Sequence, residues 1–566
     1  MGLANGGPEP RFNATFSPVF PPPGPIGFVS QSGALGLAAL ALLGTSLGVS
    51  GFVSMGNAAD LGPNDLLLYF DENPTTDVIL AYLESVPDPR RLARIARRVS
   101  RHKPVVVVKA GRSGAGRRAA SSHTAAMAAG EPAVEALFHQ AGVIRVDALE
   151  EMFDVAALAS ARRAPHGRRV AVLTKGGGPG ILVTDACEAA GLLMPVLSED
   201  TQGALRGGLP PEAAVGNPVD MIASASAEDY GRSLRVLEAA EEVDAVIVVF
   251  IPPFLTRAED VAGEIAAAAG DLPADKPVVA VFMTAAAPPE SLSQADIPSF
   301  TYPERAAAAL GRMARWAEWR ARPAGRVVTP PGIDHARGRA LLDEVLDSRP
   351  DGGWAEAAAA EEHFAAYGIP AVRTRRVRTQ SEAAAAQAEL GGPVVVKVAA
   401  PIHKSDVGAV ALGIDSPQEA AEVLGRIRAA LAAAGLGEEA GEFLVQEQVQ
   451  DGVEMIVGVS HDPAFGPLVM AGLGGTTVEL LGDVALRLTP LSDTDVDEML
   501  RSLRSYRLLT GYRQSPPLDV GAFAELLHRV SAMVEDIPEI AELDMNPVFV
   551  RRHGVVVADV RVRLSL

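Results

Sequence analysis

The chain contains little cysteine, little lysine and no excess of positive charge. Its 566 residues include one cysteine, Cys187, which excludes a disulfide framework and a zinc site built on thiolates. Lysine and arginine together number 50 against 70 aspartates and glutamates, so the formal net charge is −20. Because no basic excess is present to neutralise phosphates, we expect neither nucleic acid nor an acidic membrane surface as a partner.

We expect neither a leader nor a continuous membrane-spanning segment in this sequence. Met1 is followed by neither a basic nor an apolar stretch. The longest membrane-like segment, residues 32–55, is interrupted by glycines such as Gly36, Gly44 and Gly48, and we interpret it as a buried helix followed by a buried strand. With 48% hydrophobic and 21% charged residues, we expect a folded cytoplasmic protein of three or four domains.

Short apolar runs alternate with alanine- and leucine-rich stretches in the first half of the chain. This alternation is typical of βαβ units on parallel sheets. It predicts two α/β domains that join near the basic segment 162–169, which contains Pro165 and Gly167. The expected strands of the first are residues 26–29, 51–53, 78–82 and 105–108, and those of the second are 170–173, 245–250 and 278–282.

A third region begins after a stretch rich in proline and glycine, residues 322–332. It opens with an expected helix at residues 356–366. The strands that follow contain interspersed polar residues, which favours an α+β domain over another doubly wound sheet. These expected strands are residues 394–398, 443–446, 455–459 and 555–560.

Two glycine-bearing loops lie between an expected strand and an expected helix. The first is Ser30-Gln31-Ser32-Gly33-Ala34, and the second is Thr174-Lys175-Gly176-Gly177-Gly178. Free N–H groups at a helix start form an anion site, although a tight turn alone explains either loop equally well. Their recurrence in successive domains predicts two helix starts that face one phosphate. The candidate phosphate-binding residues are Ser30, Ser32, Gly33, Ala34, Gly177 and Gly178.

A histidine lies among small residues between these loops, in Ser121-Ser122-His123-Thr124. An isolated histidine is more often structural, but this surrounding leaves the imidazole of His123 sterically free to act as a nucleophile or base. Glu84 follows the expected strand 78–82, at the edge where parallel sheets carry catalytic groups. A carboxylate there is suited to orient an imidazole.

The third region carries candidate nucleotide and metal ligands. Lys397 lies on an apolar strand, where an ammonium requires a partner, and we expect a nucleotide phosphate. His403 follows in a polar loop. Asn546 and Asp559, with Asp544 as a further candidate, offer oxygen ligands suited to Mg²⁺, although any one of them is also explained as a solvated strand end. The residues predicted to bind the nucleoside are Gln446, Glu447 and Glu454.

The chain has only six lysines, and all other fixed positive charge is arginine. A chain rich in alanine and arginine with so few lysines is typical of a GC-rich genome. Four of the lysines nevertheless lie in or beside glycine-, serine- or histidine-bearing loops, where a mobile point charge suits phosphate. The lysines are Lys103, Lys109, Lys175, Lys276, Lys397 and Lys404.

These motifs together resemble the nucleoside-diphosphate-forming acyl-CoA synthetases, the ADP-forming acetate–CoA ligase family, which is related to succinyl-CoA synthetase. The resemblance runs through nearly the whole chain. It rests on Ser30-Gln31-Ser32-Gly33-Ala34, Ser122-His123-Thr124, Asn217-Pro218-Val219-Asp220, His403-Lys404-Ser405-Asp406 and Leu543-Asp544-Met545-Asn546-Pro547.

The resemblance implies two doubly wound flavodoxin-like domains followed by an α+β ATP-grasp domain. It implies that His123 is the phosphorylated nucleophile, that Glu84 stabilises it, and that His403 is a second phosphoryl carrier. Mg²⁺ is then the cofactor, and ATP or ADP, phosphate, CoA and a carboxylic acid are the substrates. The implied segments are a remnant or linker at 1–24, flavodoxin-like domains at 25–163 and 164–325, a linker at 326–350 and the ATP-grasp domain at 351–566.

The chain departs from this family at its start, because no CoA-binding Rossmann domain with a G-x-G-x-x-G motif precedes residue 25. We expect a truncated gene model, a separate CoA-binding subunit or a loss of CoA binding. The acyl group stays open among acetate, a branched acid and an aryl acid, and a homo-oligomer is a further expectation. The alternatives in function are a regulatory or scaffolding module and a carboxylate–amine ligase of the ATP-grasp class.

Overall fold

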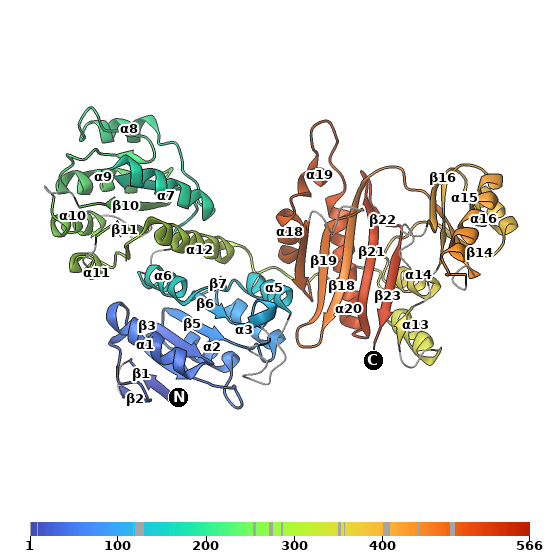
Figure 1. The fold of residues 1–566 in the computed structure, drawn as a ribbon, viewed down its shortest axis with the longest axis horizontal. Coiled ribbons are helices and arrows are strands. Elements are labelled where there is room, and N and C mark those ends of the chain that lie inside the picture. Colours follow the sequence, from blue (N-terminus) through green and yellow to red (C-terminus); the bar gives the residue numbers. More distant parts are fainter. Residues whose placement is uncertain are drawn as a thin grey trace. The chain divides into compact units, whose positions relative to one another are not determined.

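A parallel sheet extended by an antiparallel hairpin forms the N-terminal part of the protein. The computed structural model describes residues 2–7, 10–116, 118, 130–161, 164–252, 256–270, 276–284, 287–348, 352–355, 357–399, 408–437, 441–475 and 482–565. The chain divides into two units, Met1–Pro323 and Ala324–Leu566 (Figure 1).

The first sheet has the strand order β2-β1-β4-β3-β5-β6-β7. The strands β4, β3, β5, β6 and β7 are parallel and follow the flavodoxin-like order. In this order β3, the first of the parallel strands in sequence, lies between β4 and β5. Its strands are β1 (Gly2–Asn5), β2 (Phe12–Thr15), β3 (Pro23–Ser30), β4 (Val49–Ser54), β5 (Val78–Leu83), β6 (Val105–Lys109) and β7 (Ile144–Val146).

Helices cover both faces of this sheet. Helices α1 (Gly33–Ser46) and α6 (Leu149–Ser160) lie on one face, and α2 (Pro63–Glu72), α3 (Pro89–Val99) and α5 (Glu131–Ala141) lie on the other. Residues 32–55 thus form a helix followed by a largely buried strand. The strand agrees with the prediction, whereas the helix is exposed on one side, with Leu42 55% exposed, and is not buried throughout. In the described part of the chain, no helix combines the length and apolarity that a membrane span requires.

The second sheet is parallel throughout and repeats the same order, as β12-β11-β10-β8-β9. Its strands are β8 (Val170–Thr174), β9 (Val219–Asp220), β10 (Ala245–Phe250), β11 (Val278–Phe282) and β12 (Ser299–Phe300). The helices around it are α7 (Gly177–Ala189), α8 (Glu199–Arg206), α9 (Ala227–Ala239), α10 (Ala258–Gly270), α11 (Glu290–Gln294) and α12 (Pro303–Ala321).

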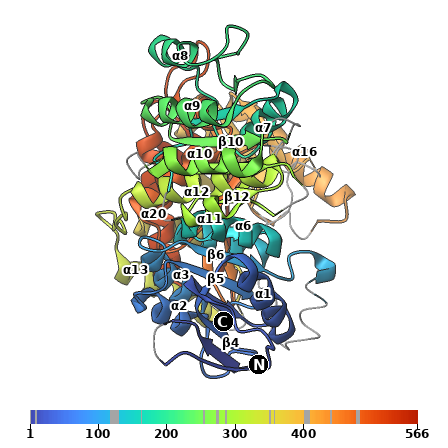
Figure 2. The same cartoon turned by 90° about the vertical axis from the view of Figure 1, so that its left-hand side faces the viewer.

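The two parallel sheets share one hydrophobic core. Helices α6 and α12 pack against each other between the sheets (Figure 2). Arg305 of α12 binds Asp154 of α6 through two hydrogen bonds of 2.8 and 2.5 Å, so a paired charge at the edge accompanies the apolar contact. The first two α/β domains therefore form a single unit.

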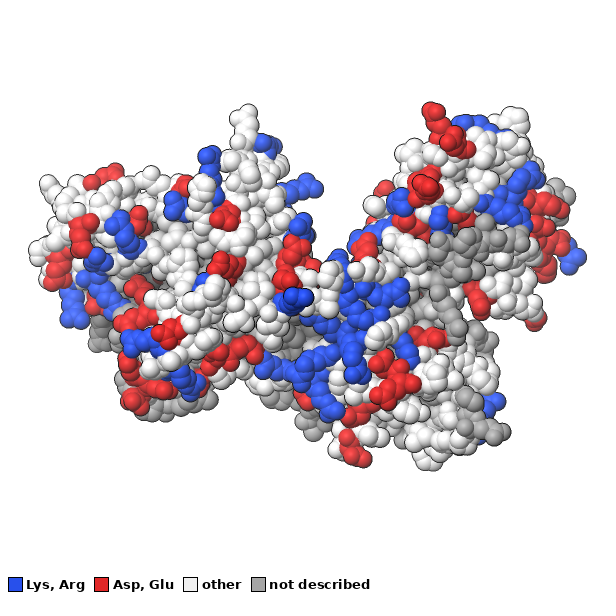
Figure 3. Space-filling view, turned by 180° about the vertical axis from the view of Figure 1, so that it is seen from behind, with Lys and Arg blue, Asp and Glu red and all other residues white. Residues whose placement is uncertain are grey.

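A cavity of about 340 Å³ between α5, β7 and α12 carries many of the arginines of this unit. Figure 3 shows basic side chains gathered on this face of the Met1–Pro323 unit. Three of the arginines that line the cavity pair with carboxylates of helices: Arg145 with Glu135 of α5, Arg168 with Glu318 of α12, and Arg312 with Glu151 of α6.

The second unit contains two antiparallel sheets. The larger has the order β13-β23-β21-β18-β19-β20 with β22 paired to β21, and the smaller has the order β14-β17-β15-β16. The strands are β13 (Gly353–Trp354), β14 (Thr374–Val377), β15 (Val394–Val398), β16 (Val410–Ile414), β17 (Phe443–Glu447), β18 (Val453–Asp462), β19 (Gly466–Leu473), β20 (Val484–Leu488), β21 (Ile540–Val550), β22 (Val555–Val557) and β23 (Val560–Leu564).

Separate sets of helices support these two sheets. Helices α15 (Gln380–Leu390) and α16 (Pro417–Ala433) pack on the small sheet. The core of the large sheet includes residues of α13 (His335–Ser348), α14 (Ala357–Ala366), α18 (Asp493–Ser502), α19 (Tyr506–Thr510) and α20 (Val520–Asp536). Two parallel α/β domains followed by an α+β domain confirm the predicted fold class.

Three segments differ from the sequence-based expectation. Residues 2–5 and 12–15, expected as a remnant or linker, form β1 and β2 because β1 pairs antiparallel with β4. Residues 335–348, expected in a linker, form α13, whose Leu341 and Leu342 are buried. The expected strand 555–560 is interrupted at Ala558 and Asp559. There the Ala558 amide donates to the carbonyl oxygen of Pro547, its in-register partner on β21, but Pro547 has no amide N–H to donate in return.

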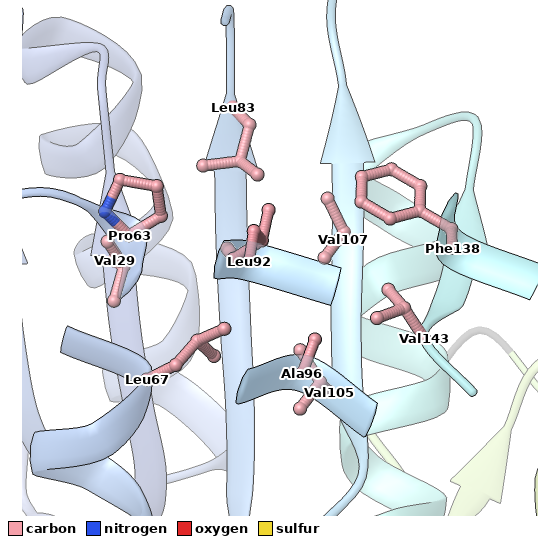
Figure 4. Close-up of a pocket in the computed structure, with 11 residues that line it drawn as sticks. Val29, Pro63, Leu67, Leu83, Leu92, Ala96, Val105, Val107, Phe138 and Val143 are labelled. Atoms are coloured by element: carbon pink, nitrogen blue, oxygen red, sulfur yellow. The ribbon is translucent and has the colours of Figure 1, made fainter. Parts of the chain in front are cut away.

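A small apolar cavity beneath the first sheet gives a test of its packing. Figure 4 shows side chains of β3, β5, β6, α2, α3 and α5 around a space of about 20 Å³. Leu92 of α3 lines it and is 2% exposed. We predict that Leu92→Ala lowers the unfolding free energy of the Met1–Pro323 unit by about 3 kcal/mol, because truncation enlarges a void that cannot collapse.

Urea unfolding followed by tryptophan fluorescence measures this change, since Trp316 and Trp319 are buried in the same unit. Val196→Ala is the control, because Val196 is 88% exposed and its truncation is expected to change stability by less than about 0.5 kcal/mol. Equal effects of the two substitutions would contradict the packing described.

Candidate active site

The first candidate site lies where the strand order of the first sheet reverses. From β3 the chain passes to α1 on one face, whereas from β5 it passes to α3 on the other face. The carboxyl ends of β3 and β5 therefore border a crevice that no crossover helix covers, which is where open α/β sheets bind ligands. Ser30 and Gln31 follow β3 at this edge, and Glu84 and Ser85 follow β5.

The buried side chain of Gln31 joins the two sides of this crevice. Its Oε1 accepts hydrogen bonds from the amides of Glu84 and Ser85, the latter at 2.9 Å, and its Nε2 donates to Ser85 Oγ at 3.1 Å. The Gln31 amide in turn donates to the Tyr82 carbonyl oxygen. Gln31 therefore holds the backbone of Glu84 at a defined position beside the start of α1.

Lys109, at the end of β6, holds the same segment from the other side. Its Nζ donates to the carbonyl oxygens of Glu84 at 2.9 Å and of Ala110 at 2.5 Å. Burial lowers the pKa of Lys109, and the carboxylates of Glu131 and Glu84 oppose that shift. Glu84 is thus held at both its amide and its carbonyl, and its half-buried side chain lies at the predicted edge of the sheet.

The start of α1 offers backbone donors next to this segment. Ser32 caps the helix by accepting from the Leu35 amide at 3.4 Å, and Ser30 Oγ donates to the Ser32 carbonyl oxygen at 2.7 Å. Among the described residues, the amides of Gly33 and Ala34 have no hydrogen-bond acceptor, and the first turn contains no acidic side chain. Such a turn binds an anion through its N–H groups and the helix dipole.

The second sheet repeats this arrangement at the junction of β8 with α7. Thr174 Oγ1 accepts from the Gly176 amide at 3.2 Å, so a serine- or threonine-based turn again precedes the helix. Helix α7 lacks a side-chain cap, and Gly177 and Gly178 at its start are exposed. The carboxylate of Asp220, at the end of β9, accepts from the Ile222 amide at 3.0 Å.

The two histidines predicted as phosphoryl carriers lie outside the described residues. His123 belongs to segment 119–129 and His403 to segment 400–407. Their proposed roles therefore rest on the sequence and on the sites that flank them.

In the second unit, Lys397 connects the two sheets. It lies on β15 of the small sheet and is 5% exposed. Its Nζ donates to Asp559 Oδ1 at 2.9 Å and to the Ala558 carbonyl oxygen at 3.0 Å, both in the break between β22 and β23 of the large sheet. The protein itself thus supplies a partner for this buried ammonium, and the binding of a nucleotide phosphate by Lys397 stays a prediction.

The residues predicted to bind a nucleoside lie on two strands that are consecutive in sequence but belong to different sheets, β17 of the small sheet and β18 of the large one. Gln446 of β17 is buried, and its Nε2 donates to Thr374 Oγ1 at 3.0 Å. Glu447 is more exposed and accepts from Arg373 Nε at 2.9 Å. Glu454 of β18 is exposed, and its backbone carbonyl accepts from the Gly474 amide at 2.8 Å. The Gln446 side-chain amide is therefore already hydrogen-bonded within the small sheet.

The three candidate metal ligands share one face of the large sheet. Asp544 and Asn546 alternate along β21 with Leu543 and Met545, whose side chains are buried in the core beneath. The Asn546 amide donates to the Asp559 carbonyl oxygen, so these two residues oppose each other across the strand pair. Asp544, Asn546 and Asp559 therefore project from the face opposite the core.

This donor set fits Mg²⁺ rather than zinc. The described residues contain no group of three or more histidine, cysteine, aspartate or glutamate side chains able to hold a metal by themselves. Mg²⁺ needs fewer protein ligands, because it keeps waters and binds through one or two carboxylates together with substrate phosphates. An aspartate and an asparagine beside a buried lysine satisfy that requirement.

Sequence reasoning named Gln31, Lys109 and Lys175 only as members of a loop or of the lysine set, and it did not assign them individual roles. Gln31 and Lys109 fix the Glu84 segment, and Lys175 lies beside the start of α7 with its side chain buried. Each is a long polar residue at or directly after the end of an apolar strand, which is a signal readable from sequence. The contacts of Gln31 and Lys109 with the Glu84 segment, however, join parts of the chain that are distant in sequence.

Three family models match successive parts of the chain. A succinyl-CoA ligase-like flavodoxin domain matches residues 23–159, and a ligase-CoA domain matches residues 170–326. An ATP-grasp domain matches residues 348–564. These ranges correspond to the two parallel-sheet domains and to the unit with two antiparallel sheets.

Two relatives align along the whole chain. An ADP-forming acetate–CoA ligase of Archaeoglobus fulgidus is 38% identical, with the alignment covering 100% of this chain and 81% of that protein. An ADP-forming 4-hydroxybutyrate–CoA ligase of Nitrosopumilus maritimus is 32% identical over the same shares of the two chains.

A solved structure supports the same relationship. The dinucleotide-forming acetyl-coenzyme A synthetase 1 of Candidatus Korarchaeum cryptofilum, in complex with phosphate and ADP, is 34% identical with a TM-score of 0.53. The match covers 56% of this chain and 70% of that one. Relatives that align with the whole of this chain and all three domain models agree. The chain therefore belongs to the family of ADP-forming acetate– and acyl–CoA ligases.

Proposed function

We propose that this ligase interconverts acyl-CoA, ADP and phosphate with a carboxylic acid, CoA and ATP through a phosphohistidine relay. The two ends of the reaction are handled by different units. The candidate phosphate-binding helix starts lie in Met1–Pro323, and the candidate nucleotide and Mg²⁺ ligands lie in Ala324–Leu566. This separation is the observation that carries the proposal, because a phosphoryl group that forms on one unit must be carried to the other.

In the proposed first step, phosphate attacks the acyl-CoA carbonyl, and an acyl phosphate and CoA result. The imidazole of His123 then attacks phosphorus, the bond to the carboxylate oxygen breaks, and the free acid leaves. Amides at the starts of α1 and α7 stabilise the phosphoryl oxygens, since phosphoryl transfer depends chiefly on positioning and charge neutralisation. Glu84, held by Gln31 and Lys109, orients the imidazole.

In the proposed second step, the phosphoryl group passes to His403 and then to the terminal phosphate of ADP. Lys397, Gln446, Glu447 and Glu454 bind the nucleotide in this proposal. Asn546 and Asp559, with Asp544 as a further ligand, hold Mg²⁺, which neutralises phosphate charge when bound. CoA is bound by a domain or subunit that supplements the described residues.

The first prediction concerns the covalent intermediate. Incubation with [γ-³²P]ATP and Mg²⁺ is expected to give an acid-labile, base-stable label on both histidines, and His123→Ala is expected to confine that label to His403. Acetyl [³²P]phosphate is expected to label His123 without nucleotide, and His123→Ala should abolish this label. His403→Ala should then block labelling from ATP and leave labelling from acetyl phosphate intact, because only the first route crosses the second unit.

His102→Ala is the matched control, since His102 belongs to the same unit and its side chain is 63% exposed. It should be labelled at the wild-type rate. Label from acetyl phosphate that persists in His123→Ala, or no label from either donor in the wild-type chain, would overturn the relay.

The second prediction concerns the metal site. We predict that Asn546→Ala raises the Mg²⁺ concentration for half-maximal labelling from ATP by about tenfold or more, because one oxygen ligand is lost. Labelling from acetyl phosphate should not change. Asp497→Ala on α18, an acidic residue whose side chain is 57% exposed, is the control. An unchanged Mg²⁺ dependence in Asn546→Ala would remove Asn546 from the ligand set.

The third prediction concerns the position of Glu84. Gln31→Leu leaves the amides of Glu84 and Ser85 without their acceptor, and we predict that labelling from acetyl phosphate slows by about 100-fold, because a shift of about 1 Å in a positioned group has that effect. The affinity for ATP should stay at the wild-type value. Gln202→Leu, in the same unit, is the control, and equal labelling rates in both variants would argue against the proposed role of Gln31.

A further inference from the structure

Lys175 differs from the other lysines in how its charge is satisfied. Its side chain is buried, with the residue 4% exposed, and its Nζ has no hydrogen-bond acceptor among the described residues. The nearest electron-rich group is the ring of Phe250, whose centroid lies 5.0 Å from Nζ. Burial lowers the pKa of Lys175, and no neighbouring carboxylate opposes that shift.

The remaining lysines of the described part of the chain all have acceptors. Lys109 and Lys397 bind the groups described above, and Lys276 donates to the Ala240 carbonyl oxygen. Lys103 donates to three backbone carbonyl oxygens at 2.7–2.9 Å. A buried ammonium without an acceptor is unfavourable for the protein alone, so Lys175 is placed for an anion that comes from outside.

The position of Lys175 agrees with this reading. It is the residue directly after β8, which lies between β9 and β10 at the point where the strand order of the second sheet reverses. Phe250 is the last residue of β10. The ammonium therefore lies at the carboxyl edge of the sheet, between the two strands that border the crevice.

The start of α7 supplies further donors at this place. In the described part of the chain, the amides of Gly177 and Gly178 have no acceptor, and α7 has 13 residues with no acidic side chain in its first turn. A Cβ on Gly178 would meet no heavy atom within 4 Å, so the backbone is open to a close approach. A Cβ on Gly177 would lie 3.4 Å from Asp220 Oδ2. An anion bound here therefore needs a nearby cation to offset the negative charge of the Asp220 carboxylate.

We propose that Lys175 binds a phosphate or phosphoryl oxyanion together with the first amides of α7. The inference rests on the proposed function for its biological meaning, and it adds a fixed charge that the helix start alone does not have. The ammonium makes this half of the site a stronger anion binder than the start of α1, where Lys109 is already bound to carbonyl oxygens.

Inorganic phosphate is the probe for the test. Protein labelled with ¹³C-lysine has six lysines, so their Hε–Cε signals are few, and Lys175→Met assigns the signal of interest. Phosphate is expected to shift the Lys175 signal in a saturable manner, with no shift of the Lys276 signal. In equilibrium dialysis with [³²P]phosphate, Lys175→Met should bind at least tenfold more weakly, and Lys276→Met should bind as the wild type does.

Thermal unfolding of Lys175→Met separates a binding role from a structural one. Removal of a buried ammonium without an acceptor should leave the midpoint unchanged or raise it, whereas a structural lysine would lower it. In turnover, the KM for phosphate should rise while the KM for ADP stays constant.

An unshifted Lys175 signal, wild-type phosphate affinity in Lys175→Met, or a lowered unfolding midpoint with unchanged affinity would each overturn the proposal. Phosphate binding is measured without ADP, CoA or turnover. Failure of His123 labelling would therefore contradict the relay without affecting the phosphate binding proposed for Lys175.

Discussion

The contact between α6 and α12 is the constraint on which the N-terminal unit depends. Each helix covers one face of its own parallel sheet, and each also buries apolar side chains against the other. A helix that is apolar on two sides cannot face water on either, so the two flavodoxin-like domains fold against each other. The unit therefore presents two switch points, each followed by a helix start without acidic residues.

Strand order then decides which residues become available for chemistry. In the first sheet β3 lies between β4 and β5, and in the second sheet β8 lies between β9 and β10. The crossover helices therefore leave to opposite faces of each sheet and expose one crevice. Gln31 and Lys109 stabilise the segment that borders the first crevice, and Lys175 lies buried beside the second. The two crevices thus share a topology and differ in charge.

Charge placement matters in this protein because the chain as a whole is acidic. A net charge of −20 repels nucleotides and phosphate at long range, so the proposed function requires local features that attract anions. The candidates for these features are helix starts and a few buried lysines. In the second unit, Lys397 is held by Asp559, and a nucleotide phosphate that approaches it meets a preorganised ion pair.

Much of the fold was readable from sequence, because apolar runs and helix-forming stretches are local signals. Such runs predict strands at 78–82, 245–250 and 278–282, and the structure has β5, β10 and β11 at these positions. The hairpin of β1 and β2 was missed, since its residues are ordinary by composition and become strands only by pairing with β4. The interruption at Ala558 and Asp559 was missed because it depends on the residue that lies opposite on β21, Pro547, which no local pattern shows.

The sequence by itself determined the class of the protein and the kinds of residue at its sites: glycine-bearing loops after strands, loop histidines, and oxygen ligands near the C-terminus. Only the tertiary structure decided which polar groups meet. Gln31 finds its acceptor and donor partners more than 50 residues away, Lys397 finds Asp559, and Lys175 finds no acceptor in the described chain. These outcomes depend on strand order and helix packing, which bring distant backbone groups together and which no local pattern encodes.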